Sequence, residues 1–471
     1  MATPVRMNSR SRILRAQWVV PVSGPPIANG EVVIEGDRIL AVREARSGCG
    51  ADEDFGDAVL LPGLVNVHTH LDYTVMRGLL EDLDFFPWIR GLTARAAALA
   101  PEDWQASAAW GAAEAVASGV TTIGDCTVSG AALAAAQQFG LGGVIYREVF
   151  GIDEARPVGE IVAELRAQVE AMRAASRGSR LKAGISPHAP YTVRPALMAA
   201  LAEYARAEDL PVCIHAAESQ AEAELLRAGG GEFAAMFERR GIAWQASGGS
   251  TVAYLDRLGI LGPDTLLVHG VQVSAADRHI QRERGFAWAH CPKSNAKLGA
   301  GIAPIGLLQG LAPGESGGGC ARVGLGSDSV ASNNTMDMFE EMRFAVLLHR
   351  AAQRRISAFG AREALEMATL GGARVLGIAD ACGSLEPGKR ADLCVVRLGG
   401  PRTGPHYDPA SALVYSAGAA DVLCTVAAGE TRYDARLGPL PEDRFPANDA
   451  RSIREPLRRA AQKLREWQAQ N

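Results

Sequence analysis

The stretch LLPGLVNVHTHLDYT, residues 60–74, combines a strand-like apolar run with two closely spaced histidines. It begins as an apolar run marked by Pro62 and Gly63 and leads into His68 and His70, two positions apart. Successive side chains of a β-strand point to opposite faces, so residues two apart share a face and can converge on one point. One His-x-His pair also occurs by chance in cores and on surfaces. The pair therefore predicts a metal site only if other donors join it.

Seven further strand-like runs follow in the middle of the chain. Most are separated by helix-like stretches rich in Ala, Leu, Glu and Arg, such as residues 104–119 and 194–210, whose apolar residues recur at helical spacing. Eight strands with helical crossovers predict an α/β fold, a (β/α)8 TIM-type barrel. With the first run included, the predicted strands are 62–70, 120–127, 143–150, 181–188, 211–218, 265–271, 285–291 and 323–330.

Both ends of the chain carry strand-like runs separated by Gly and Pro turns. Residues 31–42 form a hairpin pattern around Gly36-Asp37, and residues 383–398 give a second set. We expect a small β-sandwich domain built from both ends, and an amphipathic helix that packs on this chain or on a second copy. The predicted division is 11–61 for the N-terminal part of the small domain, 62–379 for the barrel, 380–430 for the C-terminal part and 431–471 for the helical extension.

The composition excludes several classes of protein. The chain has 471 residues, 48% of them hydrophobic, enough for one large domain and a smaller one. A net charge of −5 gives no basic field for nucleic acid or an anionic membrane, and no apolar run is long enough to span a bilayer. Eight scattered cysteines without a Cys-x-x-Cys pair indicate reduced thiols. We expect a cytoplasmic protein with a small-molecule substrate, no nucleic-acid or membrane partner, and the capacity to form a homo-oligomer.

Polar residues end several of the predicted barrel strands. His188 ends the fourth strand, His215 and Glu218 end the fifth, His269 ends the sixth and Asp328 ends the eighth. In barrels of this kind the active site is built from the C-terminal ends of the strands. Together with the histidine pair of the first strand, these positions predict a metal site.

His68, His70, His215 and Asp328 supply the N and O donors that a hydrolytic zinc needs, with a position left for water. Asp328 can also accept a proton from that water. Two-metal versions of this architecture often use a modified lysine at the end of the fourth strand, where residues 184–190 read GISPHAP. We therefore expect one metal ion, most simply Zn²⁺, although the donor set also suits Fe²⁺ or Mn²⁺.

Glu218 and His269 are the candidates for proton transfer. Glu218 follows His215 by three residues, which can place a carboxylate beside the reacting water without making it a ligand. The alternative for such a glutamate is a helix cap or a surface group, and we favour that interpretation for Glu222 and Glu224. His269 ends an apolar strand and could orient the attacking water. The alternative is a core histidine bonded to backbone.

Seven segments together resemble the mononuclear deaminase and chlorohydrolase branch of the amidohydrolase superfamily, and the resemblance covers residues 12–430. Within that branch the chain is similar to the deaminases of methylthioadenosine, S-adenosylhomocysteine and aminodeoxyfutalosine. FFPWIRGLT and STVAYLDRLGIL favour the aminodeoxyfutalosine enzymes. The seven segments are NVHTHLDYTVMRGLLEDL (66–83), SPHAPYT (186–192), HAAES (215–219), LLVHG (266–270), CPKSN (291–295), GLGSDSVASNNTMDMFEEMR (324–343) and GSLEPGKRADL (383–393).

The resemblance implies an aminohydrolase, a metal-dependent hydrolytic deaminase that releases ammonia from an adenine-type nucleoside. It implies the same four metal ligands, with Glu218 and His269 as acid and base partners. It also implies substrate-binding residues that spacing alone does not reveal. These are Glu81 for the ribose hydroxyls, His188, and Arg147 as a contact of the nucleoside.

Other functions stay open on the same scaffold. The ring that the enzyme hydrolyses could instead be guanine, a halogenated triazine or a cyclic amide. A more remote alternative is that the protein is a metal-free barrel that serves as a scaffold. Phe85, Phe86 and Trp88 either cover a purine ring or belong to the core. The chain departs from its relatives at Ser327, where many have Thr, in the Gly-rich run 314–320, and in the tail past residue 431.

Overall fold

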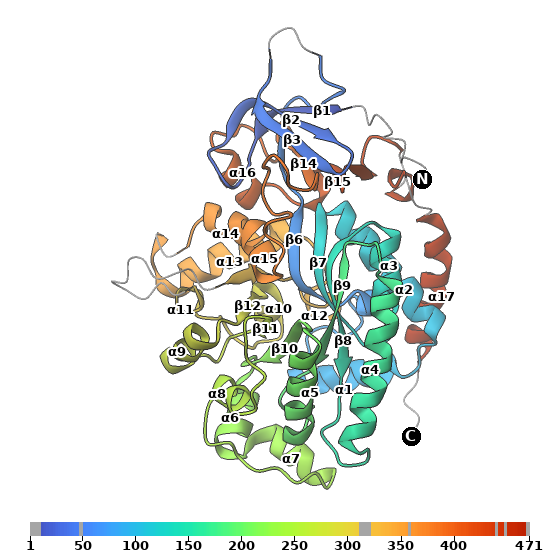
Figure 1. The fold of residues 1–471 in the computed structure, drawn as a ribbon, viewed down its shortest axis with the longest axis vertical. Helices are drawn as coiled ribbons and strands as arrows, with labels where there is room; N and C mark the ends of the chain where they lie inside the picture. Colours follow the sequence, from blue (N-terminus) through green and yellow to red (C-terminus); the bar gives the residue numbers. More distant parts are fainter. Residues whose placement is uncertain are drawn as a thin grey trace, which may run out of the picture.

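Two β-sheets organise the chain, one in the barrel and one in a smaller domain at the end of the molecule where the blue and orange strands meet (Figure 1). The structure is a computed structural model that describes residues 11–46, 50–309, 322–356, 359–438, 441–446 and 450–467. The Gly-rich run at 314–320 lies outside the described residues.

The barrel sheet contains eight parallel strands in chain order, and this confirms the predicted (β/α)8 fold. Its first and last strands meet through a bridge between Thr69 and Asp328, where the Asp328 N–H donates to the His68 carbonyl at 2.9 Å. The strands are β6 (Leu64–Thr69), β7 (Val120–Thr127), β8 (Gly142–Val149), β9 (Leu181–Pro187), β10 (Val212–Ala216), β11 (Thr265–His269), β12 (Ala287–His290) and β13 (Val323–Leu325).

Gly326 allows the last strand to lie directly against the first histidine. A Cβ atom at this position would lie 2.9 Å from the His68 Cβ and 3.0 Å from the His68 carbonyl oxygen. Real Cβ atoms do not approach other atoms so closely, so a larger residue would push β13 away from β6. The closure that brings Asp328 beside His68 therefore depends on a glycine here.

Helices cover the outer face of the barrel (Figure 1). In α4 the residues Ile161, Leu165, Val169 and Met172 are buried at helical spacing, which gives one apolar stripe toward the strands. None of the helices in the described ranges is long and apolar enough to cross a membrane. The helices of the barrel region are η1 (Leu71–Met76), α1 (Phe85–Ala96), α2 (Pro101–Ala117), α3 (Ala131–Gln138), α4 (Val158–Ala175), α5 (Pro195–Ala207), α6 (Gln220–Ala228), α7 (Gly231–Arg239), α8 (Thr251–Arg257), α9 (Ala275–Arg284), α10 (Pro292–Lys297), α11 (Ile305–Leu308), α12 (Val330–Asn333), α13 (Met338–Gln353), α14 (Ala361–Met367) and α15 (Leu370–Val375).

The small domain is built from both chain ends, as predicted, and its strands form one mixed sheet. The two faces of β5 pack into two different hydrophobic cores. Leu60 belongs to the apolar cluster of the small domain, whereas Val59 and Leu61 belong to the cluster of the barrel. The sheet therefore packs directly against the barrel. Its elements are β1 (Arg12–Val19), β2 (Ile27–Glu35), β3 (Arg38–Glu44), β4 (Glu53–Asp54), β5 (Ala58–Pro62), β14 (Leu393–Arg397), β15 (Val422–Ala427) and β16 (Glu430–Asp434), with α16 (Pro409–Tyr415), η3 (Ala419–Asp421) and η4 (Pro441–Arg444).

The C-terminal helix α17 (Arg451–Glu466) packs against α2 on this same chain, along the flank of the barrel (Figure 1). Lys463 Nζ lies 2.6 Å from Asp103 Oδ2, and the Arg95 guanidinium lies 4.6 Å from the centre of the Trp467 ring. Leu464 is buried in a cluster with Trp88 of α1. The extension therefore supports α1.

Leu464→Ala is expected to lower the free energy of unfolding by about 2–5 kcal/mol, because it leaves a cavity beneath α1. Urea denaturation measures the change. Arg465→Ala is the control, since Arg465 is exposed on the same helix. Equal stability of the two variants would show that α17 does not support the barrel.

Candidate metal centre

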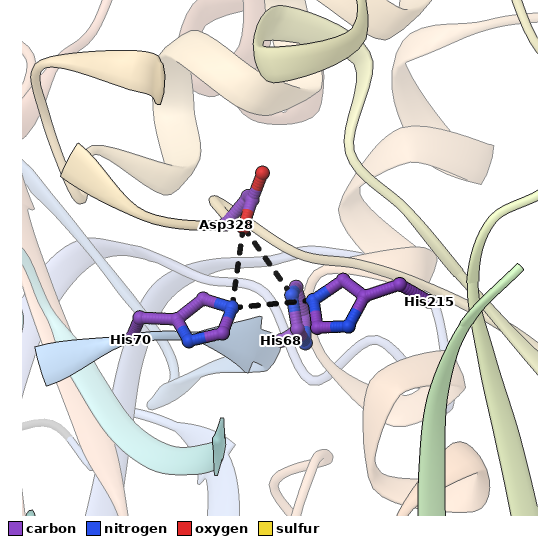
Figure 2. A group of neighbouring side chains, drawn as sticks. All are labelled: His68, His70, His215 and Asp328. Carbon is purple, nitrogen blue, oxygen red and sulfur yellow. Dashed lines mark hydrogen bonds and ion pairs between the residues drawn. The ribbon is translucent and has the colours of Figure 1, made fainter. Parts of the chain in front are cut away.

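Four donor side chains meet at the C-terminal mouth of the barrel (Figure 2). One ligand atom from each of His68, His70, His215 and Asp328 lies within 4.8 Å of every other. The Nε2 atoms of His70 and His215 are 3.3 Å apart, and Asp328 Oδ1 lies 3.3 Å from His68 Nε2 and 3.5 Å from His70 Nε2. All four residues are buried. The structure thus brings together the four ligands that the sequence predicts.

Strand alternation aims His215 into the barrel. Cys213 belongs to the cluster inside the barrel, whereas Val212 and Ile214 pack outside it. His215 therefore shares the inner face with Cys213. Its Nδ1–H donates to the His188 carbonyl at 2.9 Å, and this bond leaves Nε2 as the lone-pair nitrogen that faces the other donors.

His269 and Asp328 reach the mouth through left-handed backbone. Their φ angles are 77° and 59°, values that non-glycine residues rarely adopt. Along β11, Leu267 packs on the outer side of the barrel, so regular alternation would also turn His269 outward. The positive φ breaks that alternation. Such strain concentrates at functional sites, where surrounding structure maintains it.

The site combines one neutral histidine with a histidine–aspartate pair that favours a positive charge. Burial lowers the pKa of His70 to about 3, so this ring is neutral and has a free lone pair. Burial also lowers the pKa of His68, but the Asp328 carboxylate outweighs that effect and raises it to about 10. His68 Nε2 is buried without a well-aligned hydrogen bond to any described residue, and its Nδ1 lies 3.9 Å from the thiols of Cys126 and Cys213. A positive charge is therefore favoured between His68 and Asp328, and a divalent ion fits this donor set.

Two hydroxyls hold the Asp328 carboxylate in place. Ser294 Oγ donates to Oδ2 at 2.5 Å and Ser332 Oγ donates to the same atom at 3.0 Å. Oδ1 is left beside His68 and His70. Ser294 belongs to the CPKSN segment after β12, whose function the sequence did not reveal.

Glu218 and His269 lie beside the donor cluster. Glu218 Oε1 is 3.7 Å from His269 Nε2, and the Tyr191 hydroxyl donates to Glu218 Oε2 at 3.4 Å. The His269 Nδ1–H donates to Asn295 Oδ1 at 2.9 Å, so its Nε2 can accept a proton. Burial raises the pKa of Glu218 above its ordinary value, so the carboxyl holds its proton to higher pH than an exposed glutamate does.

A cavity of about 80 Å³ opens directly on these groups. Phe85 and Trp88 form part of its apolar wall, whereas Phe86 lines a larger adjoining hollow of about 650 Å³. His188 also lines the cavity, with Nδ1 2.9 Å from the Thr192 hydroxyl. The residues around the cavity are His70, Tyr73, Phe85, Trp88, Ile89, Leu92, Glu148, His188, Tyr191, His215, Glu218, His269, Leu298, Asp328, Ser329 and Ser332.

Glu148 is a cavity residue that the sequence analysis missed. On β8, Val144 and Tyr146 point into the barrel, while Ile145 and Val149 point out, so Glu148 faces inward. The alternation of this strand was the signal that could have identified it. Its Oε1 is buried without a hydrogen-bond partner among the described residues, and burial raises its pKa to about 8.

Two predicted substrate contacts are not brought to the cavity. Arg147, on the outer side of β8, donates from Nε to Gln168 Oε1 at 2.9 Å and from Nη1 to the Val128 carbonyl. Glu81 lies on the rim, where Oε1 accepts from Lys297 Nζ at 3.0 Å and from Asn334 Nδ2 at 2.8 Å. Both side chains are held by neighbours away from the donor cluster.

Glu222 is buried rather than a surface group. Its carboxylate accepts from the N–H of Ala217 at 2.8 Å, from the N–H of Glu218 at 2.9 Å and from the Thr251 hydroxyl at 2.7 Å. Burial raises its pKa to about 7, while these hydrogen bonds oppose the rise. Glu222 therefore caps the loop that carries Glu218, whereas Glu224 is exposed as expected.

Glu222→Ala is expected to lower the free energy of unfolding by at least about 2 kcal/mol, because two buried N–H groups and a hydroxyl lose their acceptor. We also expect a lower kcat, since the backbone of Glu218 loses its anchor. Denaturation and steady-state kinetics measure the two effects. Glu224→Ala, on the same helix, should change neither, and an unchanged Glu222→Ala variant would contradict the capping role.

Comparison of the sequence with protein families matches residues 59–432 to the amidohydrolase family. A 5-methylthioadenosine/S-adenosylhomocysteine deaminase of Desulforudis audaxviator is 35% identical over 424 residues, which cover 88% of this chain and 92% of the relative. A 5'-deoxyadenosine deaminase of Methanosarcina mazei is 34% identical, with coverage of 89% and 91%.

Solved structures of similar fold include a deaminase and a chlorohydrolase. A zinc-bound adenosine deaminase from Xanthomonas campestris superposes with a TM-score of 0.82 at 29% identity, covering 97% of this chain and 98% of that chain. A zinc complex of an atrazine chlorohydrolase from Arthrobacter aurescens TC1 has a TM-score of 0.79 at 22% identity, with coverage of 95% and 99%. The second likeness supports the fold alone.

Proposed function

This chain belongs to the amidohydrolase family, and on that premise we propose that it is a metal-dependent deaminase of adenine nucleosides. The proposal rests on one juxtaposition: three histidines and an aspartate converge within 4.8 Å, beside a buried carboxyl and an imidazole that can transfer protons. The reaction class is hydrolysis of a C–N bond in a cyclic amidine.

His68, His70, His215 and Asp328 would hold the metal ion, for which zinc fits best because three imidazoles and one carboxylate are among its preferred ligands. Zinc is also bound in the similar adenosine deaminase structure. A bound divalent ion lowers the pKa of water toward neutrality and thereby supplies a nucleophile for the ring carbon.

Asp328 and His269 are placed to take the proton of the attacking water. The hydroxyls of Ser294 and Ser332 occupy Asp328 Oδ2, so Oδ1 is the oxygen that faces the donor cluster. His269 keeps Nε2 as its acceptor because Nδ1–H is bonded to Asn295. Both residues line the cavity beside the donor cluster.

Glu218 would donate a proton to the ring nitrogen next to the amino-bearing carbon and then help ammonia to leave. Burial keeps its carboxyl protonated to higher pH than usual, as a general acid requires. The Tyr191 hydroxyl and Glu222 hold Glu218 by its side chain and its backbone. These roles give an inosine-like product.

The substrate is inferred from the named relatives. Those at 34–35% identity are named for 5-methylthioadenosine, S-adenosylhomocysteine and 5'-deoxyadenosine. We therefore place 5'-modified adenine nucleosides first, and aminodeoxyfutalosine stays a prediction. The triazine enzymes share the fold at 22% identity, and this likeness does not change the ranking of the candidate substrates.

We also propose a cytoplasmic setting. All six cysteines of the described residues are free and buried, as is usual for proteins of a reducing compartment. Formation of a homo-oligomer stays a prediction.

The test is ammonia release by the zinc-supplemented enzyme from 5'-deoxyadenosine, 5-methylthioadenosine, S-adenosylhomocysteine, aminodeoxyfutalosine, adenosine and guanine. We expect one or more adenine nucleosides to be deaminated well above guanine. Turnover of guanine alone, or silence across all six with metal bound, would contradict the proposal.

A further inference from the structure

The carboxylate inside the cavity is Glu148, whereas Glu81 is held at the rim. Glu148 is 7% exposed and lines the cavity together with His70 and His188. Glu81 does not line the cavity. Both of its oxygens are engaged by Lys297, and one of them also accepts from Asn334. The two glutamates therefore differ in whether they can meet a bound molecule.

One oxygen of Glu148 is buried and lacks a partner. Oε1 makes no hydrogen bond within the described part of the chain, while Oε2 lies 3.9 Å from His70 Nδ1, beyond hydrogen-bond distance. A buried carboxylate oxygen without a donor is costly, and such groups are satisfied by water or by a ligand. Glu148 Oε1, on the wall of the cavity, therefore indicates a ligand that carries a hydrogen-bond donor.

The position of Glu148 indicates which part of the ligand it meets. His70 presents Nε2 to the donor cluster and Nδ1 to Glu148, and the Glu148 carboxylate lies within 4.8 Å of a nitrogen of His215, so Glu148 borders the donor cluster on the side of His70. Glu218 and His269, which flank the reacting atom in the proposed mechanism, come from β10 and β11. Glu148 comes from β8, two strands away from the strand that leads to Glu218, so the two carboxyl groups can meet different parts of one bound molecule.

Resting on the proposed function, we propose that Glu148 is the specificity residue that recognises the ribose of the nucleoside. A vicinal diol offers two O–H donors, and a carboxylate is the acceptor that accommodates them best. His188 lies in the same part of the cavity, since its ring nitrogen, the Glu148 carboxylate and His215 are within 4.8 Å of one another. Glu148 thereby takes the role that the family resemblance implies for Glu81.

The test compares kcat/KM for adenosine, 2'-deoxyadenosine and 3'-deoxyadenosine. The wild-type enzyme should prefer adenosine by about 10–100-fold over at least one deoxy analogue, the usual effect of leaving a buried acceptor without its donor. In Glu148→Ala this preference should fall below about threefold, because the acceptor is gone. Glu148→Gln, which keeps the shape of the site, should give an intermediate value.

Zinc content and Glu81→Ala serve as controls. Each Glu148 variant should retain zinc, which separates loss of recognition from loss of metal, and Glu81→Ala should keep the full preference for adenosine. An undiminished preference in Glu148→Ala, or its loss in Glu81→Ala, would overturn the assignment while the deaminase function stands. Failure of the zinc-loaded wild-type enzyme to deaminate any adenine nucleoside, the 5'-modified ones included, would overturn the proposed function, and this assignment with it.

Discussion

Glu218→Gln is expected to lower kcat for nucleoside deamination by about 10²–10⁴-fold, the usual contribution of a general acid or base. The amide keeps the size of the side chain and can still bond to Tyr191, but it cannot donate and recover a proton at the ring nitrogen. Because Glu218 is not one of the four clustered donors, zinc content should not change. Ammonia release and metal analysis measure the two quantities on one preparation.

The matched control is Glu224→Gln, six residues further along the chain on α6 and exposed. This variant should keep normal kcat. A Glu218→Gln enzyme with near-normal turnover would show that another group supplies the proton. A fall in turnover that parallels a loss of zinc would assign Glu218 to the metal site instead.

His215→Ala is expected to remove zinc and activity together. Only three donors would remain, and the backbone carbonyl of His188 would lose the Nδ1–H that it accepts. Residues that merely orient metal ligands change affinity or activity by 10–100-fold, so loss of a ligand should reduce activity by more than about 100-fold. Zinc content after dialysis and kcat/KM measure the effect.

Ser294→Ala provides the comparison for that variant. It leaves all four donors in place and removes one hydrogen bond from Asp328 Oδ2, while Ser332 still donates to the same atom. We expect a smaller loss that added zinc partly restores. Full zinc and full activity in His215→Ala would contradict the proposed ligand set.

The barrel and its donor set could be predicted from the sequence because both depend on local pattern. Short apolar strands that end in His68, His215 and Asp328 indicate strand position and chemistry together, and the parallel sheet then gathers the strand ends at one mouth. The small domain was predictable in the same way, from strand-like runs at both chain ends.

Substrate contacts were harder to predict because they depend on side-chain direction and on distant neighbours. Arg147 and Glu148 are adjacent in sequence, yet strand alternation turns one toward α4 and the other into the cavity. Glu81 is held by Lys297 and Asn334, more than 200 residues away along the chain. The burial of Glu222 was hard to predict for the same reason, because the three groups that donate to its carboxylate come together only in the folded loop.

The most direct test of the central claim is zinc titration of the metal-free enzyme, followed by ammonia release from 5'-deoxyadenosine. The geometry of His68, His70, His215 and Asp328 predicts no activity without metal and a linear rise to a plateau at one zinc ion per chain. Full activity of the metal-free protein, or a plateau reached only at two ions per chain, would contradict the account.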